Sequence, residues 1–221
     1  MLNVVDFLKN IPKTNAYGEN ITVVGATKMV DTATIKQAVS LGLTDIGENK
    51  VQEFIEKYDD YPTANYHFIG HLQTNKVKYL VGKVHLIQSV DSIKLLNAIN
   101  EQAKKHSIVQ RILLEVNIAN DPNKHGFSHE EVIDAVLKAT SLENIQLEGL
   151  MTVLPKYENK NNLVSICLQM RALYDIINKD IFRLKYLSMG MSNDFDVAIE
   201  CGSNMIRIGS AIFGERNYDK L

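Results

Sequence analysis

The chain has 221 residues, 45% of them hydrophobic, which is enough apolar material for one sizeable core or two small ones. Its 24 basic and 26 acidic residues give a formal net charge of −2, which excludes a strongly basic nucleic-acid-binding protein and an acidic tail protein. No apolar run is long enough to span a bilayer, and the N-terminus carries an acid where a secretory signal is basic. We therefore expect a cytoplasmic globular protein that binds no nucleic acid and no membrane.

Short β-branched runs alternate with amphipathic helical stretches along the chain. The predicted strands are 21–25, 44–46, 66–69, 84–87, 111–116, 146–150, 186–188 and 205–208. The predicted helices are 4–8, before the first strand, and then 31–41, 50–58, 75–81, 92–105, 128–140, 161–178 and 194–199. Ser128 and Glu131 have the spacing of a capping box, which marks the start of the helix 128–140 more clearly than any other.

The alternation of strands and helices predicts a parallel sheet. Eight such units in 221 residues suit a closed (β/α)8 barrel, the TIM barrel, near the lower end of its usual size. The rival is an open doubly wound sheet, but the first strand–helix turn contains a single Gly25 and no glycine-rich dinucleotide fingerprint. Because no linker or change in composition divides the chain, we expect one domain over residues 1–221.

Functional groups of such a barrel lie at the carboxyl ends of its strands. Lys28 follows the first apolar strand, so we expect its ammonium group in the barrel mouth. Desolvation in such a place lowers the pKa of an amine, and a neutral amine can form a Schiff base with an aldehyde. The alternative is a lysine that simply extends to solvent.

Arg207 lies among apolar residues in the Met-Ile-Arg-Ile sequence of the last predicted strand. A guanidinium group in this setting either points into the barrel mouth or pairs with a buried acid, because an unpaired buried charge is costly. The residues alone leave both interpretations open.

Two segments rich in glycine and serine follow the last two predicted strands. They are Ser-Met-Gly-Met-Ser at 188–192 and Gly-Ser at 209–210. Barrels often bind phosphate at this place, through backbone N–H groups and a helix N-terminus. Either segment could be an ordinary turn, but two of them on adjacent strands, one beside Arg207, favour a phosphate site.

Other patterns carry less information. His67 and His71 are four residues apart, but no glutamate follows the first histidine and no third ligand is near in the sequence, so we expect no zinc site. Cys167 and Cys201 have neither metal-ligand spacing nor the pattern of a disulfide framework, and we expect buried thiols. The Gly-Glu-Asn sequence at 47–49 has no independent interpretation.

A lysine after the first strand, a phosphate site after the last two and an arginine on the eighth together suggest pyridoxal 5′-phosphate (PLP). Several motifs then occur in a familiar order, namely Gly-Glu-Asn at 47–49 with Gln-Glu at 52–53, His-Phe-Ile-Gly at 67–70 with Leu-Gln-Thr-Asn-Lys at 72–76, Gly-Leu-Met at 149–151, Leu-Ser-Met-Gly-Met-Ser at 187–192, and Arg-Ile-Gly-Ser-Ala-Ile-Phe-Gly at 207–214. On these motifs the chain, from about residue 21 to 218, resembles the pyridoxal phosphate homeostasis protein family, also called the PLP-binding protein or proline synthase co-transcribed homologue family.

The resemblance implies a barrel like the N-terminal domain of alanine racemase, with PLP held on a lysine as a Schiff base. It implies that Lys28 is that lysine and that Arg207 faces the pyridine nitrogen. The other matched positions are Ser192, Gly209 and Ser210 for the phosphate, Asn49 and Met151 for the pocket walls, and Lys124 for another family lysine on a loop.

One departure from the family concerns the residues around Lys28. The family usually reads Ser-Lys-Thr-Lys-Pro, whereas this chain reads Thr-Lys-Met-Val-Asp at 27–31, so Val30 replaces the second lysine. This replacement puts in doubt any role of the second lysine in passing PLP on, but it leaves the Schiff-base lysine unaffected.

Two classes of function remain, a PLP carrier and a PLP-dependent enzyme such as an amino-acid racemase. A charged Arg207 disfavours protonation of the pyridine nitrogen, which weakens carbanion stabilisation yet is compatible with a racemase. Similar racemases also need a tyrosine base from an additional β-domain, and the sequence ends at Leu221 without room for one. We therefore expect a monomeric protein that holds PLP and supplies it to apo-enzymes without being an enzyme itself.

Overall fold

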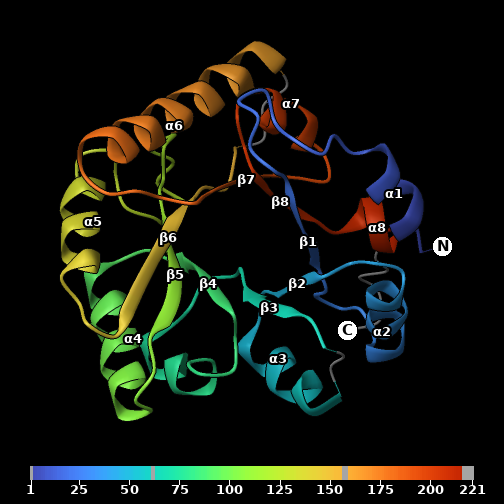
Figure 1. Cartoon of the computed structure of the whole chain (residues 1–221), viewed down its shortest axis with the longest axis horizontal. Coiled ribbons are helices and arrows are strands. Elements are labelled where there is room, and N and C mark those ends of the chain that lie inside the picture. Colours follow the sequence, from blue (N-terminus) through green and yellow to red (C-terminus); the bar gives the residue numbers. More distant parts are fainter. Residues whose placement is uncertain (1, 61–62, 156–158, 216–221) are drawn as a thin grey trace.

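A closed barrel of eight parallel strands, ordered β1 to β8, forms the centre of the molecule (Figure 1). The computed structural model describes residues 2–60, 63–155 and 159–215. Residues 22–25 of β1 pair with residues 205–208 of β8, which closes the sheet on itself. The predicted (β/α)8 barrel is therefore confirmed, and the open doubly wound sheet is excluded.

The elements follow one another in the predicted order. The strands are β1 (Thr22–Ala26), β2 (Asp45–Glu48), β3 (Asn65–Phe68), β4 (Leu86–Val90), β5 (Gln110–Glu115), β6 (Ile145–Met151), β7 (Tyr186–Met191) and β8 (Met205–Ile208). The helices are α1 (Val4–Asn10), α2 (Thr32–Ser40), α3 (Val51–Lys57), α4 (Ile93–Lys105), α5 (Val132–Thr140), α6 (Lys160–Asp180), α7 (Phe195–Glu200) and α8 (Ser210–Phe213), with 3-10 turns η1 (Tyr58–Asp60) and η2 (Thr74–Tyr79). The helix predicted before the first strand is α1, whereas the predicted helix 75–81 is the 3-10 turn η2.

The start predicted for the helix 128–140 is wrong, because α5 begins at Val132. The capping contacts are nonetheless present in the turn before it. The Ser128 N–H donates to Glu131 Oε2 (2.9 Å), and the Glu131 N–H donates to Ser128 Oγ (3.2 Å). The capping pair therefore closes the turn that leads into the helix rather than the first turn of the helix itself.

The strand predicted at 186–188 is too short, because β7 continues to Met191. Gly190 within this extension has a φ of +99°, a conformation that glycine adopts without strain. A Cβ atom at this position would lie 2.7 Å from Ala198 Cβ on α7. Glycine thus lets α7 pack directly against the end of β7, and residues 189–191 lie in the strand instead of in a loop.

Apolar side chains fill both the barrel interior and the layer between barrel and helices. Two large clusters combine strand and helix residues and so form the outer layer. A third cluster draws its buried members from five strands and no helix, and therefore lies inside the barrel; they are Val24, Leu86, Leu113, Met151 and Met205. The two cysteines are buried, as expected.

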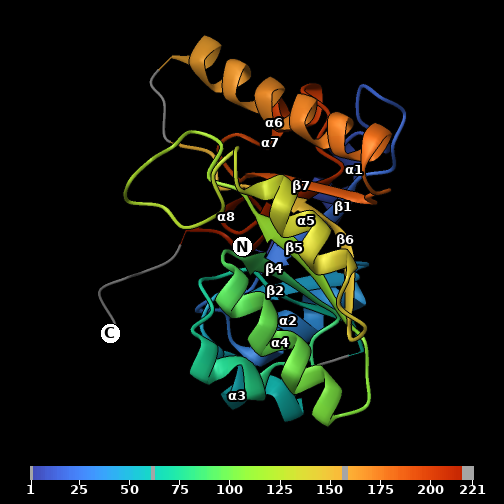
Figure 2. The ribbon, with the colours of Figure 1, turned by 90° about the vertical axis from the view of Figure 1, so that its left-hand side faces the viewer.

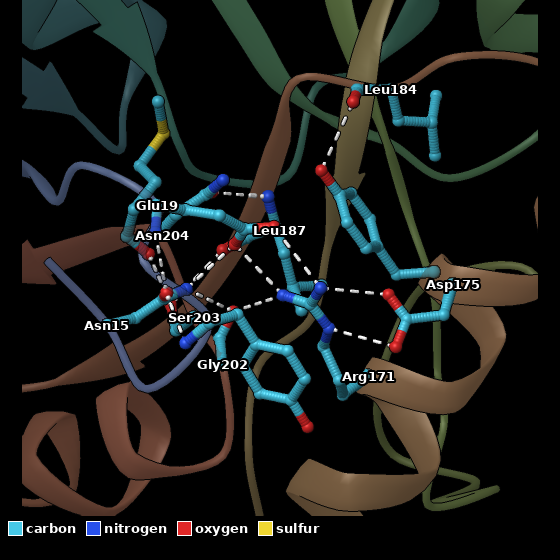
Figure 3. A network of polar contacts seen from close by, with 12 residues as sticks. Asn15, Glu19, Arg171, Asp175, Leu184, Leu187, Gly202, Ser203 and Asn204 are labelled. Atoms are coloured by element: carbon cyan, nitrogen blue, oxygen red, sulfur yellow. Dashed lines mark hydrogen bonds and ion pairs between the residues drawn. The ribbon is translucent and has the colours of Figure 1, made fainter. Parts of the chain in front are cut away.

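A network of polar contacts around Arg171 on α6 joins segments at the amino ends of the strands (Figure 3). Its guanidinium group donates to Glu19 Oε2 (2.9 Å) and to the Gly202 carbonyl (3.0 Å), and it pairs with Asp175 Oδ1 (2.9 Å). The same group lies 3.8 Å from the centre of the Tyr17 ring. These contacts join the segment before β1 to α6 and to the turn before β8, at the end of a TIM barrel that serves stability.

Helix α6 lies beside α7 in both views of the chain (Figures 1 and 2). At 21 residues it is the longest helix, and its buried face includes Cys167, Met170, Leu173 and Ile177. Among the residues that the structure describes, no helix is both long and apolar enough to cross a membrane.

Candidate functional site

A cleft of about 790 Å³ opens at the carboxyl ends of the strands. Six of the seven predicted ligand-binding residues line it, and they come from the ends of β1, β2, β7 and β8: Lys28, Asn49, Ser192, Arg207, Gly209 and Ser210. Met151 does not line the cleft, because its side chain is fully buried in the interior cluster of the barrel. The structure therefore brings together the amine, the guanidinium group and the glycine–serine segments that the sequence placed at strand ends.

Lys28 lies two residues beyond β1, on the inward face that Val24 and Ala26 begin. Within the described residues, no hydrogen bond or ion pair involves its ammonium group. The backbone on either side is held tightly. The Thr27 N–H donates to the Gly47 carbonyl (2.9 Å), and the Met29 N–H donates to Glu53 Oε1. The backbone of Lys28 is thus held on both sides, and its side chain lines the cleft.

A partly buried lysine, Lys57 on α3, organises the loop that carries Lys28. Its ammonium group donates to the Thr27 carbonyl (3.0 Å) and pairs with Glu48 Oε1 (3.0 Å) and Glu53 Oε1 (2.6 Å). The Thr27 hydroxyl also donates to Glu48 Oε1 (2.7 Å). Burial raises the pKa of Glu48, and Lys57 opposes this rise. We name Lys57, Glu48 and Glu53 the loop clamp, because the contacts of its members fix the residues before and after Lys28.

Arg207 on β8 is buried and points into the barrel, since it shares the inward face of Met205 two residues earlier. Its Nη1 donates to the Ser188 carbonyl (3.0 Å) and hydroxyl (2.7 Å), and its Nη2 donates to the Thr152 carbonyl (2.8 Å). Burial lowers the pKa of the guanidinium group to about 10, while the carboxylates of Glu115 and Asp194 oppose the shift. Arg207 is therefore a charged group at the floor of the cleft, held by neutral oxygens.

Behind Arg207, a chain of hydrogen bonds crosses the barrel interior. Ser188 donates its hydroxyl hydrogen to Gln88 Oε1 (2.7 Å), Gln88 Nε2 lies 2.8 Å from His67 Nδ1, and His67 Nε2 lies 3.0 Å from Asp45 Oδ1. All five residues are buried. Burial would raise the pKa of Asp45, but hydrogen bonds from His67 and other neighbours lower it. We call Arg207, Ser188, Gln88, His67 and Asp45 the interior hydrogen-bond chain.

The ends of β7 and β8 meet at Ser192. Its hydroxyl oxygen accepts from the N–H groups of Gly209 (3.1 Å) and Ala211 (3.4 Å). The two backbone N–H groups at the start of α8 thus hold the Ser192 oxygen, its hydroxyl hydrogen is the donor that remains, and the exposed Ser210 lies beside it. A group of donors of this kind suits an anion such as phosphate.

Two acids that the sequence analysis missed lie near these groups. Burial raises the pKa of Glu115, the last residue of β5, to about 7, with the Asp91 charge adding to the shift and Arg207 opposing it. Burial also raises the pKa of Asp194, which lines the cleft and accepts from the Met191 N–H. The charged groups that act on Glu115 come from other parts of the chain, so no local pattern in the sequence marks it.

Asn49 forms a cleft wall where the chain leaves β2. Its backbone passes so close to Gly70 that a Cβ there would lie 2.1 Å from the Asn49 carbonyl oxygen. Lys124, on the loop after β5, donates to the Val153 carbonyl (3.0 Å), and burial lowers the pKa of its amine. Lys124 is half-buried but is not among the residues that line the cleft.

Residues 11–217 match the family model of the alanine racemase N-terminal domain, which together with the barrel defines the class of this protein. The chain is 42% identical to the pyridoxal phosphate homeostasis protein of Aquifex aeolicus over 205 residues, which is 91% of this chain and 90% of that protein. The protein of the same name from Pasteurella multocida is 34% identical over 206 residues, covering 90% and 88%. The chain therefore belongs to the pyridoxal phosphate homeostasis protein family.

Solved structures agree with this assignment. PipY of Synechococcus elongatus PCC7942 without PLP has a TM-score of 0.86 at 28% identity, covering 95% of this chain and 97% of that chain. The structure of PipY with PLP bound has a TM-score of 0.84 at 26% identity and the same coverage. Alanine racemase of Clostridium difficile 630 shares the fold, with a TM-score of 0.77 at 17% identity over 99% of this chain and 57% of the racemase.

Proposed function

We propose that this chain binds pyridoxal 5′-phosphate in the cleft, holds it on Lys28 as a Schiff base, and buffers it or supplies it to apo-enzymes without robust turnover. The observation that carries the proposal is the convergence, in one cleft, of an amine, a buried guanidinium group and the serine hydroxyls at the ends of β7 and β8. The PLP-bound structure of PipY, which is similar along nearly the whole chain, supports it. The same proposal treats residues 1–221 as one domain that acts in the cytoplasm as a monomer.

Each part of the cofactor finds suitable residues in the cleft. PLP would supply an aldehyde when bound, and the neutral primary amine of a lysine could condense with it, with loss of one water molecule. Lys28 provides the amine, and the loop clamp fixes the backbone that carries it. The hydroxyl hydrogens of Ser192 and Ser210 provide donors for the phosphate, and the N–H groups of Gly209 and Ala211 hold the Ser192 oxygen in place.

Arg207 explains why we expect little turnover. A carboxylate beside the pyridine nitrogen would keep that nitrogen protonated and make the cofactor a strong electron sink. Arg207 is instead a cation at neutral pH, because its pKa stays at about 10 in spite of burial. Its bonds to Ser188 and Thr152 hold it in place. A cation here disfavours protonation of the ring nitrogen and so weakens the stabilisation of carbanions.

Replacing both Ser192 and Ser210 with alanine is expected to weaken PLP binding at least tenfold. Each change removes a hydroxyl donor to a dianion, and a charge-assisted hydrogen bond contributes about 1.5–3 kcal/mol. PLP retained after dialysis, measured by absorption, checks this result. Ser141→Ala, an exposed serine at the end of α5, is the matched control and should leave retention unchanged. Equal retention by the double variant and the control would locate the phosphate elsewhere.

With L-alanine or other common amino acids, the PLP-loaded protein is expected to turn over far more slowly than ordinary enzymes, which reach about 1–10³ s⁻¹. The reason is the cation at Arg207. Chiral chromatography of the amino acid measures racemisation, and recovery of activity by an added apo-enzyme measures transfer of PLP. Steady racemisation or decarboxylation in the ordinary range, lost in Lys28→Ala, would replace the carrier function with an enzymatic one.

A further inference from the structure

Three side chains outside the cleft converge at the same end of the barrel. His71 lies on the loop after β3, Asp91 directly follows β4, and His125 lies on the loop after β5. His71 Nδ1 is 3.0 Å and His125 Nδ1 is 3.8 Å from Asp91 Oδ2. The potential ligand atoms of all three lie within 4.8 Å of one another. None of the three lines the cleft.

The donor set is one that zinc accepts. Two imidazole nitrogens and one carboxylate oxygen make three protein ligands, and an open zinc site completes its tetrahedron with water. The exposed fractions of the three side chains fit a site with protein ligands on one side of the ion and water on the other. The Asp91 side chain is 9% exposed, whereas those of His71 and His125 are 43% and 57% exposed. The carboxylate is thus fixed by its surroundings, and solvent reaches the site from the side of the histidines.

The distances also suit a shared ion. Ligands about 2.0–2.2 Å from a tetrahedral zinc ion lie roughly 3.3 Å apart. The two observed Nδ1–Oδ2 distances, 3.0 and 3.8 Å, lie on either side of this value. The rings of His71 and His125 are stacked at a centroid distance of 3.8 Å and an angle of 13°. Because an ion lies in the plane of each ring that binds it, the rings must turn out of the stack, and their exposure permits this.

The charges around the three side chains favour a cation. The Asp91 carboxylate supplies the negative charge, and the Nδ1 atoms of both histidines face one of its oxygens, Oδ2. The ammonium group of Lys124, the residue before His125, donates to the Val153 carbonyl. A divalent ion between Asp91 and the histidines would pair with this carboxylate.

We propose that His71, Asp91 and His125 form a site for one divalent transition-metal ion, with zinc as the best fit, at the rim of the barrel beside the cleft. The site is independent of the proposed PLP function, because it shares no residue with the cleft. The two histidines bind through neutral nitrogens and Asp91 through its carboxylate, with water in the remaining position.

The test is a titration of the full chain with zinc chloride after treatment with a chelator, followed by calorimetry. We expect one ion per chain. His71→Ala and His125→Ala should each weaken binding at least tenfold, since loss of even an outer partner of a ligand commonly costs about 10–100-fold. Both positions are exposed, so the variants should fold like the parent. His129→Ala, an exposed histidine on the same loop, is the matched control and should bind like the parent.

Three results would overturn the proposal. The first is the absence of stoichiometric binding by the parent chain. The second is an equal loss of affinity in His125→Ala and His129→Ala, which would indicate scattered surface histidines. The third is full binding by a variant lacking both His71 and His125, which would locate the ion elsewhere, for example at Cys167 and Cys201. Since the titration contains no PLP, its outcome is separate from that of the proposed function.

Discussion

Replacement of Lys28 by alanine is expected to abolish covalent retention of PLP. The C=N bond needs an amine in the cleft, and Lys28 is the lysine that lines it among the residues that the structure describes. The fold should survive, because the loop clamp holds the backbone of the loop through Thr27 and Met29 and not through the Lys28 side chain. Weak non-covalent binding through the phosphate contacts is compatible with this result.

Reduction with borohydride after loading with PLP, followed by peptide mass spectrometry, measures the effect. The parent should carry one reduced adduct on Lys28, and Lys28→Ala should carry none. Two control variants, Lys36→Ala on the exposed face of α2 and Lys124→Ala, should keep the adduct. An adduct on Lys124, or one that persists in Lys28→Ala, would disprove the assignment of Lys28.

The second large effect concerns Glu115 and the pH dependence of stability. Its pKa is raised from 4.5 to about 7, so the folded state binds this proton more tightly than the unfolded state. The free energy of unfolding therefore falls as the pH rises from about 4.5 to about 7 and stays lower above that range. A pKa shift of this size changes the free energy of unfolding by about 3 kcal/mol, since each pKa unit corresponds to about 1.4 kcal/mol.

Glu115→Gln should remove this part of the pH dependence. Urea unfolding at pH 4.5 and pH 8, followed by circular dichroism because the chain has no tryptophan, measures it. The variant should lose about 3 kcal/mol less stability than the parent between the two pH values. Glu143→Gln, at an exposed position, should behave like the parent. Identical pH profiles for the parent and Glu115→Gln would refute the expectation.

The fold could be predicted because each of its eight units carries its own local signal. Apolar β-branched runs and helical periodicity indicate the elements, and their alternation leaves few topologies. The errors occurred where tertiary packing overrides that signal. Met189 and Gly190 resemble a turn in the sequence, yet they continue β7 because α7 packs against the glycine.

The cleft was partly predictable for a similar reason. Groups such as Lys28 and Arg207 could be found because a barrel collects strand ends, which the sequence locates. The residues that act on these groups or on their neighbours could not be found, because they come from other strands and helices of the barrel. They are Lys57, Glu115 and Gln88. In the Gly-Glu-Asn sequence at 47–49, the family resemblance already implied that the asparagine is a pocket wall. The part played by its glycine and glutamate is visible only in three dimensions, where both hold Thr27.

The interior hydrogen-bond chain connects the cleft at one opening of the barrel to Asp45 at the other. Asp45 only accepts, so His67 carries its hydrogen on Nε2 and accepts on Nδ1 from the Gln88 amide. The oxygen of Gln88 then receives the hydroxyl hydrogen of Ser188, whose lone pair remains for Arg207. The tautomer of His67, the orientation of the Gln88 amide and the direction of the Ser188 hydroxyl therefore depend on one another. Reversing any one of them would place two donors or two acceptors face to face. A carboxylate at one opening of the barrel thus orients the cation that lines the cleft at the other.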